Sequence, residues 1–188
     1  MKKFLANFSD RIQTFLKRYL LVKNMENKSD EVWKLLVQLH KSSGFHHGVY
    51  EKERIVETSF SNSSDRTNLF LYQLQNEHLI FRSRVLTDFD VSQTNDVLVL
   101  CSHLNSIVGF GVVRPDLRNR QVEFYYKANI VPYYFDEEVL YLDTRRHFQV
   151  SQDFAKAFDE LIASNEDPVF IFSEFMRQID QETETSTN

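Results

Sequence analysis

The sequence predicts an α+β fold in which an antiparallel β-sheet, built from two meanders, carries helices packed on one face. Three observations predict it. Strand-like runs of alternating apolar and polar residues come in two groups, and stretches with helical spacing precede, separate and follow them. The connections within each group are short, as antiparallel neighbours require. With only 4 Gly and 3 Pro among 188 residues, the chain lacks the turn-forming residues of a many-stranded sandwich or barrel.

The first predicted element is an N-terminal amphipathic helix over residues 1–23. Its apolar residues recur at steps of three and four and form one broad stripe. The stripe includes Phe4, Phe8, Ile12, Phe15 and Tyr19. Residues 1–28 hold seven Lys and Arg against two acids, a net charge of +5, whereas residues 136–188 carry a net charge of −9. A basic head and an acidic tail can attract each other within one molecule or between two.

A second helix and a first meander are predicted next. The polar residues 24–28 are the expected linker, after which Ser29 caps a helix that stops at Gly44. Short polar turns then separate three strands with alternating faces. These predicted strands cover residues 56–60, 68–75 and 79–85.

The middle of the chain predicts another helix and a second meander. Residues 97–104 hold the apolar side of the helix. The meander consists of strands at 108–113 and 121–130 around a turn at Pro115, and the second of these strands alternates strictly, so one face is buried and the other is wet. Residues 138–148 are predicted to add one more strand.

The last part of the chain predicts helices and a polar tail. Ser151 is expected to cap the first of these helices, and Asp167 followed by Pro168 is a start signal for the second. The polar end of the chain is expected to be disordered. The predicted organisation is an amphipathic helical arm and linker over 1–28, one α+β domain over 29–180, and a disordered tail over 181–188.

A helix, a short strand, a turn and an aromatic strand follow one another from Asn95 to Ile130, with Asn105 and Gly109 between the first two. This pattern resembles the YbjN group, also called bacterial sensory-transduction-regulator-like proteins, and the resemblance covers roughly residues 29–165. It implies the fold of the type III secretion chaperones, a tendency to dimerise, and binding without catalysis. No catalytic residue is carried over, because the group offers no catalytic motif. The N-terminal arm and the final helix have no counterpart in it.

Composition and missing motifs exclude several classes of protein. The single cysteine, Cys101, permits neither an internal disulfide nor a thiolate metal centre. No apolar run reaches the roughly 18 residues of a membrane span, and Arg11, Lys17 and Arg18 interrupt any secretory signal. We therefore expect a cytoplasmic protein. The sequence has no Walker loop, dinucleotide fingerprint, zincin helix or nucleophile elbow, so we expect no enzymatic activity and no cofactor.

The histidines and the cysteine are expected to have neither a metal-binding nor a catalytic role. His46 and His47 follow His40, but adjacent histidines seldom point the same way, so no metal site is expected. Cys101 and His103 stand two residues apart on a predicted helix and face different directions, which argues against a nucleophile pair.

The acidic and basic clusters also have structural interpretations. The carboxylates at Asp88, Asp90 and residues 136–138 occur beside turns, where such groups cap helices, whereas acid–base catalysis needs a closed site. A cationic aromatic surface for phosphate or single-stranded nucleic acid is a further interpretation. Because the chain is acidic and has no nucleic-acid-binding motif, we expect no such partner. The residues of that surface would be Arg82, Arg84, Tyr125, Lys127, Arg145 and Arg146.

The N-terminal helix carries the functional hypothesis. We expect a non-catalytic adaptor, chaperone or regulator that binds another protein or a second copy of itself, as a homodimer, through an apolar surface. The expected partner contacts are Phe4, Phe8, Phe15 and Tyr19. One alternative is a small-molecule-binding protein or an enzyme of unidentified type. A second is a peripheral membrane protein, since a basic amphipathic helix also suits an anionic membrane surface.

Overall fold

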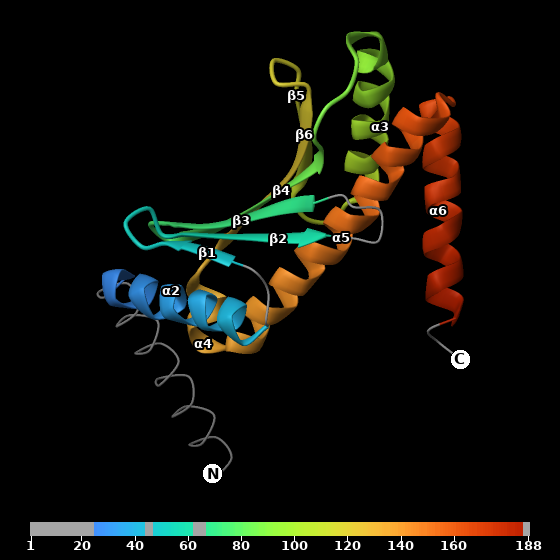
Figure 1. Ribbon diagram of the computed structural model, residues 1–188. Helices are drawn as coiled ribbons and strands as arrows, with labels where there is room; N and C mark the ends of the chain where they lie inside the picture. The colour runs from blue at the N-terminus through green and yellow to red at the C-terminus, as the bar shows by residue number, and fades with distance from the viewer. Residues whose placement is uncertain (1–24, 44–46, 62–66, 186–188) are drawn as a thin grey trace.

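A six-stranded antiparallel sheet in the order β1-β2-β3-β4-β6-β5 forms the centre of the molecule (Figure 1). The computed structural model describes residues 25–43, 47–61 and 67–185. The strands are β1 (His47–Tyr50), β2 (Ile55–Ser61), β3 (Thr67–Gln75), β4 (His78–Leu86), β5 (Val112–Asp116) and β6 (Gln121–Asn129). The helices are α2 (Met25–Ser42), α3 (Thr94–Ile107), α4 (Val131–Phe135), α5 (Glu137–Ser164) and α6 (Pro168–Thr185), with a short 3-10 turn, η1 (Val91–Gln93).

The two predicted meanders are present and join into one sheet through β4 and β6. The turn predicted at Pro115 is wrong, because Pro115 lies within β5 and the chain turns at residues 117–120. The first meander also contains a strand that the sequence did not predict, β1, which pairs with β2. Its four residues, HGVY, are too few to show an alternation. The link between the meanders runs from His78 opposite Asn129 to Leu86 opposite Val122, with an irregularity after Arg84. α3 lies in the connection between them.

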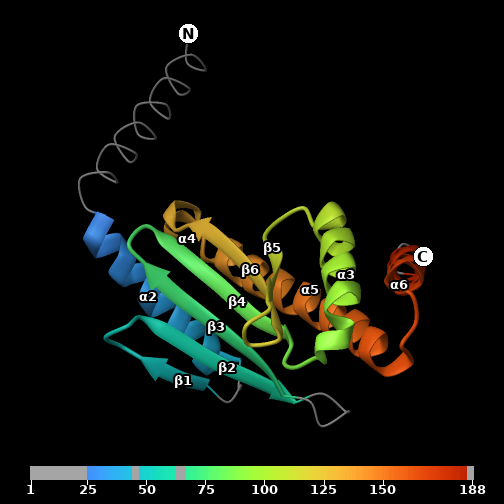
Figure 2. The ribbon, with the colours of Figure 1, turned by 90° about the horizontal axis from the view of Figure 1, so that it is seen from above.

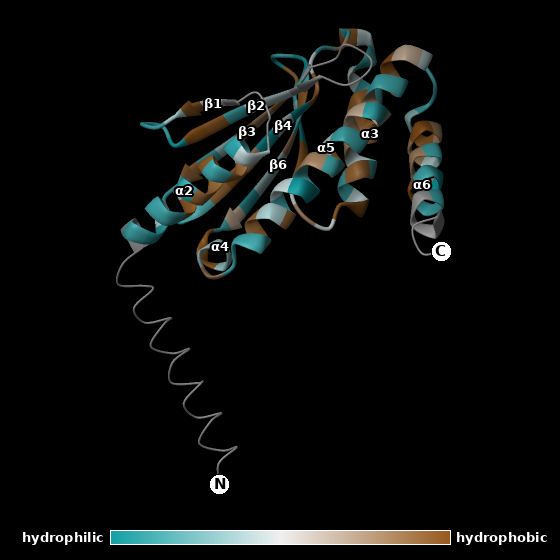
Figure 3. Ribbon diagram, turned by 60° about the horizontal axis from the view of Figure 1, so that its bottom comes forward, coloured by the Kyte–Doolittle hydropathy of each residue, from teal (hydrophilic) through white to brown (hydrophobic). Residues whose placement is uncertain are grey.

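The helices cover one face of the sheet. In the registers of the central strands, the buried residues Phe70, Tyr72, Phe81 and Phe124 share one face. Figure 2 shows α2 and α5 behind that face, with the opposite face turned to the viewer. Hydrophilic and hydrophobic bands alternate along both helices in Figure 3, as expected of helices that each bury one stripe. This arrangement confirms the predicted fold class.

Two hydrophobic cores lie along α5. One is enclosed by α2, α4 and strands β2 to β4, and it includes Leu36, Tyr72 and Tyr133. The other gathers residues of α3, α5, α6 and the far part of the sheet, including Leu104 and Phe158. At 28 residues, α5 is about 42 Å long and reaches both cores. Figure 1 shows it running beneath the sheet from α4 to α6.

The predicted strand at 138–148 is wrong, because these residues form the first half of α5. The helix begins at Asp136, whose carboxylate accepts a hydrogen bond from the Glu138 amide at 3.0 Å. Ser151, predicted as a cap, lies buried in the middle of the helix. Two polar residues, His147 and Ser151, occupy buried positions of its stripe and break the apolar period from which a helix is recognised.

Two further boundaries differ from the prediction. α2 begins at Met25, so residues 25–28, expected in a linker, belong to its first turn, and α6 continues to Thr185 into the expected tail. The predicted N-terminal helix, with Phe4, Phe8, Phe15 and Tyr19, falls outside the described residues. Within the described ranges, no helix is both long and apolar enough to cross a membrane.

Candidate functional site

An open groove lined largely by apolar side chains lies between α2 and α5. It consists of two adjoining hollows of about 310 and 320 Å³ that share Leu39 and Tyr141. We define the α2–α5 groove by five lining residues. They are Leu35, Leu39, Leu140, Tyr141 and Phe148.

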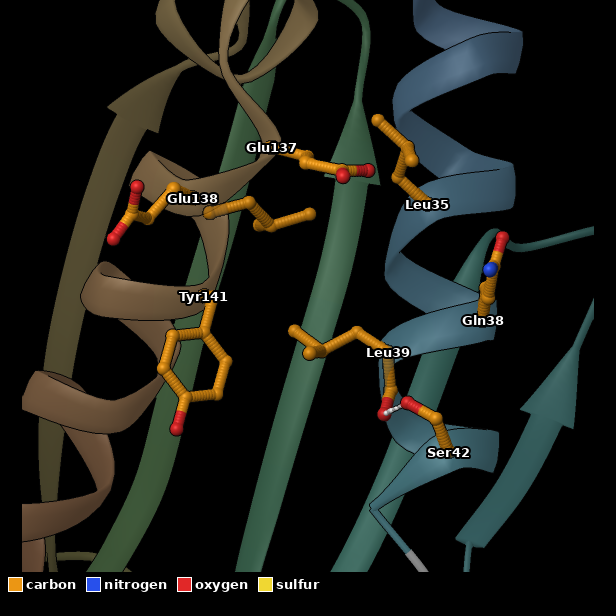
Figure 4. A pocket seen from close by; sticks show the side chains of 8 residues that line it. Leu35, Gln38, Leu39, Ser42, Glu137, Glu138 and Tyr141 are labelled. Carbon is orange, nitrogen blue, oxygen red and sulfur yellow. Dashed lines mark hydrogen bonds between the residues drawn. The ribbon is translucent and has the colours of Figure 1, made fainter.

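Helical spacing places these side chains on facing walls. Leu35 and Leu39 stand one turn apart on α2, and Tyr141 and Phe148 stand two turns apart on α5. Figure 4 shows Leu39 and Tyr141 turned toward the space between the two helices, with Gln38 and Ser42 on the outer side of α2. Tyr141 remains 46% exposed, so its ring contributes apolar surface that the described chain leaves uncovered.

The floor of the groove is aromatic and rigid. His40 Nδ1 donates to the Leu36 carbonyl at 2.8 Å, which fixes the imidazole against α2. Its ring centroid lies 4.7 Å from that of Tyr72 on the sheet. Burial raises the pKa of the Tyr72 phenol, which therefore stays neutral. The floor is thus formed by two buried rings in contact with each other.

Three charged residues line the groove among the described residues. Glu137 and Glu138 are exposed at the end beside Leu35, and Figure 4 shows Glu137 turned toward Leu35. Arg145 lines the second hollow, one helical turn after Tyr141. A ligand that fills the groove would therefore meet two acids beside Leu35 and one base further along α5.

Tyrosine hydroxyls fix the α5 wall to the sheet and to α4. Tyr133 Oη donates to Asp143 Oδ2 at 2.6 Å, and Tyr126 Oη lies 3.3 Å from the same oxygen. Burial is the main cause that raises the pKa of Tyr133, and the hydrogen bond to the Asp143 carboxylate is the second cause. The Asp143 carboxylate is thus held by two phenols, which tie α5 to α4 and to β6.

Beneath the sheet, His147 occupies an aromatic cage and is fully buried. Its ring stacks on Phe124 at 5.3 Å between centroids, and those of Phe70, Tyr72 and Phe81 lie within 5.9 Å. Neither ring nitrogen has a hydrogen-bond partner of ordinary geometry among the described residues. Burial lowers the pKa of His147 to about 3, with the Phe124 backbone opposing the shift. The histidine is therefore a neutral core residue at physiological pH.

The other titratable candidates from the sequence are engaged in structure. Cys101 is buried, and burial raises the pKa of its thiol to about 12, so it is not a thiolate nucleophile. His103 stacks on Phe172 at 4.9 Å, on α6. Asp88 pairs with Arg120 at 3.2 Å. Across the described ranges, no group of three or more His, Cys, Asp and Glu residues is arranged to hold a metal ion. His46 and the side chain of the neighbouring histidine lie outside the described positions.

The cationic aromatic surface divides into two separate parts. Arg82 faces Tyr125 across β4 and β6 on the uncovered face of the sheet, but it pairs with Glu123 at 2.7 Å. Arg114 covers the Tyr125 ring at 3.7 Å. Arg145 and Arg146 belong to α5 on the covered side, because their segment is helix and not strand. The surface is therefore smaller and more neutral than the sequence suggested.

A third hollow, of about 510 Å³, lies beside the turn between β3 and β4 and is mostly polar. Its residue Arg54 donates to Ser29 Oγ at 2.8 Å and pairs with Asp30 on α2. These contacts tie the start of α2 to the sheet. The guanidinium is thus already engaged in structure.

Sequence reasoning missed the groove because one of its walls was predicted as a strand. In a strand, Tyr141 and Phe148 would lie on opposite faces, whereas seven residues make two turns of a helix and place them on the same face. The Asp136-Glu137-Glu138 cluster was the available signal, since acids gather at helix starts.

No protein-family model matches this sequence, and no curated protein matches it. The fold is similar to the crystal structure of YbjN from E. coli, which is described as a candidate transcription regulator. The TM-score is 0.51 at 10% sequence identity, and the match covers 69% of this chain and 93% of that chain. The chain therefore has a YbjN-like α+β fold, as the resemblance in its sequence predicted.

Proposed function

We propose that this protein is a non-catalytic regulator or adaptor of the cytoplasm, in which the α2–α5 groove binds an amphipathic helix of a protein partner. The lining of the groove is the observation that carries the proposal. Apolar side chains at helical spacing on two facing helices fit the mode of recognition in which a helix lays its apolar stripe into a groove. The description of YbjN as a candidate regulator is consistent with such a role.

The chemistry of the site supports binding over catalysis. The thiol of Cys101 and the imidazole of His147 are both buried and neutral. The carboxylate of Asp136 is used to cap α5. The α2–α5 groove itself presents mainly aliphatic and aromatic side chains, which bind by burying apolar area.

The dimensions of the groove define its ligand. Along α2 it extends from Leu35 to Ser43, which is about 12 Å, or a little more than two turns of helix. Two turns present two or three anchoring side chains at steps of three and four. The acidic end at Glu137 and Glu138 favours a ligand that carries Lys or Arg beside its apolar stripe.

A site-specific photo-crosslink tests this function. Tyr141 is replaced by a photoreactive phenylalanine analogue in the cell that makes the protein, and Leu142 is replaced in the same way as a control. The two residues are adjacent on α5 and 46% and 51% exposed, but only Tyr141 lines the groove. We expect an adduct with one defined protein from position 141, mapped to an amphipathic segment, and none from 142. Equal labelling at both positions, or none at either, would contradict the proposal.

A further inference from the structure

We propose that the α2–α5 groove of each copy receives the N-terminal arm, residues 1–24, of a second copy, so that two chains form a dimer by exchanging arms. The inference rests on the proposed function of the groove and names its occupant. Three observations support it: the apolar stripe of the arm, the charges at the acidic end of the groove, and the place where α2 begins.

The apolar repeat of the arm matches the apolar lining of the groove. The arm repeats apolar residues at steps of three and four, among them Phe8, Ile12 and Phe15. The groove presents Leu39 and Tyr141 as facing apolar walls over about two turns. A helix lying there would bury both stripes at once, which is the main source of free energy in such contacts.

The charges are complementary as well. Residues 1–24 carry six Lys and Arg against Asp10. In the helix that the sequence predicts for the arm, Arg11 and Arg18 would each follow a stripe residue, Phe8 or Phe15, by three positions, within reach of the edges of a groove. Glu137 and Glu138 stand exposed at the end of the groove. Seated there, the basic residues of the arm would meet these acids and fix its direction.

The start of α2 indicates that the arm comes from another copy. α2 begins at Met25, and the arm helix predicted from the sequence ends at Lys23, so one residue separates them. A helical hairpin needs a loop of about 2–5 residues. The chain has no Gly or Pro before Gly44 with which to make a tighter reversal. An arm that does not reverse cannot reach the groove of its own chain.

Unwinding residues 25–27 would supply such a loop at the cost of the first turn of α2, and contacts of Lys28 and Ser29 hold the helix beyond that turn. Ser29 is buried, and its hydroxyl donates to the Asn76 carbonyl at 3.3 Å and accepts from Arg54 at 2.8 Å. The Lys28 ammonium lies 5.0 Å from the centroid of the Tyr134 ring. Because reciprocal insertion into a second copy leaves α2 intact from Met25, it is favoured over a reversal within one chain, and it closes as a two-fold dimer.

The mass of the full-length protein and of matched variants tests the exchange. Light scattering after size exclusion should find a dimer for the natural sequence. Phe8→Asp with Phe15→Asp, or Tyr141→Asp in the groove, should weaken dimerisation at least 100-fold. The matched controls are Asn7→Asp with Thr14→Asp, on the other side of the arm, and Leu142→Asp beside the groove. Both controls should remain dimeric, and Trp33 fluorescence should report all variants as folded.

A mixing experiment distinguishes exchange from a general loss of solubility or folding. The arm variant retains an intact groove, and the groove variant retains an intact arm. Mixed in equal amounts, the two should form a one-to-one heterodimer held by a single inserted arm. A natural protein that is monomeric, or variants that stay dimeric or fail to combine, would overturn the inference.

A disulfide identifies which copy supplies the arm. In a Cys101→Ser background, Phe15→Cys and Leu39→Cys should oxidise to a bond between two chains. A bond within one chain, or none, would overturn arm exchange.

If the purified protein is monomeric while Tyr141 crosslinks to a different protein in the cell, the inference fails and the proposed function stands. If Tyr141 crosslinks to nothing, both fail.

Discussion

At the scale of single residues, two glycines close together in the chain have opposite constraints. Gly111 has a φ of +71°, and a Cβ there would lie 2.7 Å from the Tyr125 carbonyl oxygen and 2.9 Å from the Phe124 ring. At Gly109 the nearest atom to such a Cβ is the Arg146 guanidinium, 3.9 Å away. Only Gly111 therefore occupies a conformation and a space that a side chain cannot share.

We expect Gly111→Ala to lower the free energy of unfolding by more than about 1 kcal/mol, because the new methyl group forces β5 away from β6. Gly109→Ala, on an exposed and open position, should change it by less than about 0.5 kcal/mol. Urea unfolding of both variants measures this. Equal effects would show that β5 can shift freely against its neighbour.

The YbjN-like sequence pattern includes Asn105 and Gly109, and of these two residues Asn105 has the clear structural role. The Asn105 amide makes two hydrogen bonds to the Val113 backbone, donating at 3.0 Å and accepting at 2.7 Å, which ties α3 to β5. The structural glycine is Gly111, two residues later. Gly109 and Gly111 are the two glycines of the same GFG sequence, and the positive φ of Gly111 distinguishes them.

His147 makes the stability of the fold depend on pH. Its pKa is lowered to about 3 in the folded protein, from about 6.5 in an unfolded chain. Between about pH 6.5 and pH 3, the unfolded chain binds a proton at this histidine and the folded protein does not. The free energy of unfolding therefore decreases as the pH is lowered through this range, by up to about 1.4 kcal/mol per pH unit. We expect His147→Leu to remove most of the loss between pH 7.5 and 5, measured by urea unfolding at both values. An identical loss in the variant would assign the pH dependence to other groups.

At the scale of elements, α5 depends on its first turn. The Asp136 carboxylate accepts from the Glu138 amide, and the turn is otherwise exposed. We expect Asp136→Ala to cost about 1 kcal/mol and Asp136→Asn, which retains the acceptor, to cost much less. Thermal unfolding followed by circular dichroism compares the two. Similar losses in both variants would point to the charge of the carboxylate, through the helix dipole, as the stabilising feature.

The same helix limits what the sequence could predict. Its second half was recognised, because Phe154, Phe158 and Leu161 follow helical steps closely. Its first half was not, because the stripe passes through His147 and Ser151, where hydrogen bonding and ring stacking replace aliphatic packing. The Ser151 hydroxyl lies 2.6 Å from that of Ser83 on β4. Burial of polar groups that satisfy each other is a tertiary fact, which periodicity in a single sequence does not carry.

At the scale of the whole molecule, α5 contributes residues to both hydrophobic cores, so we expect the two cores to unfold as one cooperative unit. The single tryptophan, Trp33, is buried in the core under α2, and its indole donates to Glu51 at 2.8 Å. Leu104 is fully buried in the other core, on α3. We expect Leu104→Ala to cost about 2–5 kcal/mol and to lower the midpoint of Trp33 fluorescence and of circular dichroism by the same amount. A Trp33 transition that stays unchanged would mean that the cores unfold separately.

The fold was largely predictable from the sequence, and the candidate site was not. Alternation and turn signals placed four of the six strands closely, whereas the strand predicted at 108–113 overlaps β5 only at residues 112 and 113. The groove depends on which helices lie side by side, and α2 and α5 come together from opposite ends of the chain. The predicted contacts Phe4, Phe8, Phe15 and Tyr19 stay predictions, because the described residues do not include them.

The two outer strands of the sheet have a consequence for solubility at high concentration. On one side β1 has four residues, and on the other β5 contains Pro115, which has no amide hydrogen to donate, between Arg114 and Asp116. A short strand and a charged, proline-containing strand are poor templates for the addition of another strand. The sheet should therefore resist growth into cross-β fibres even where the chain is abundant, and stacking of its edges is not a route by which copies of this protein come together.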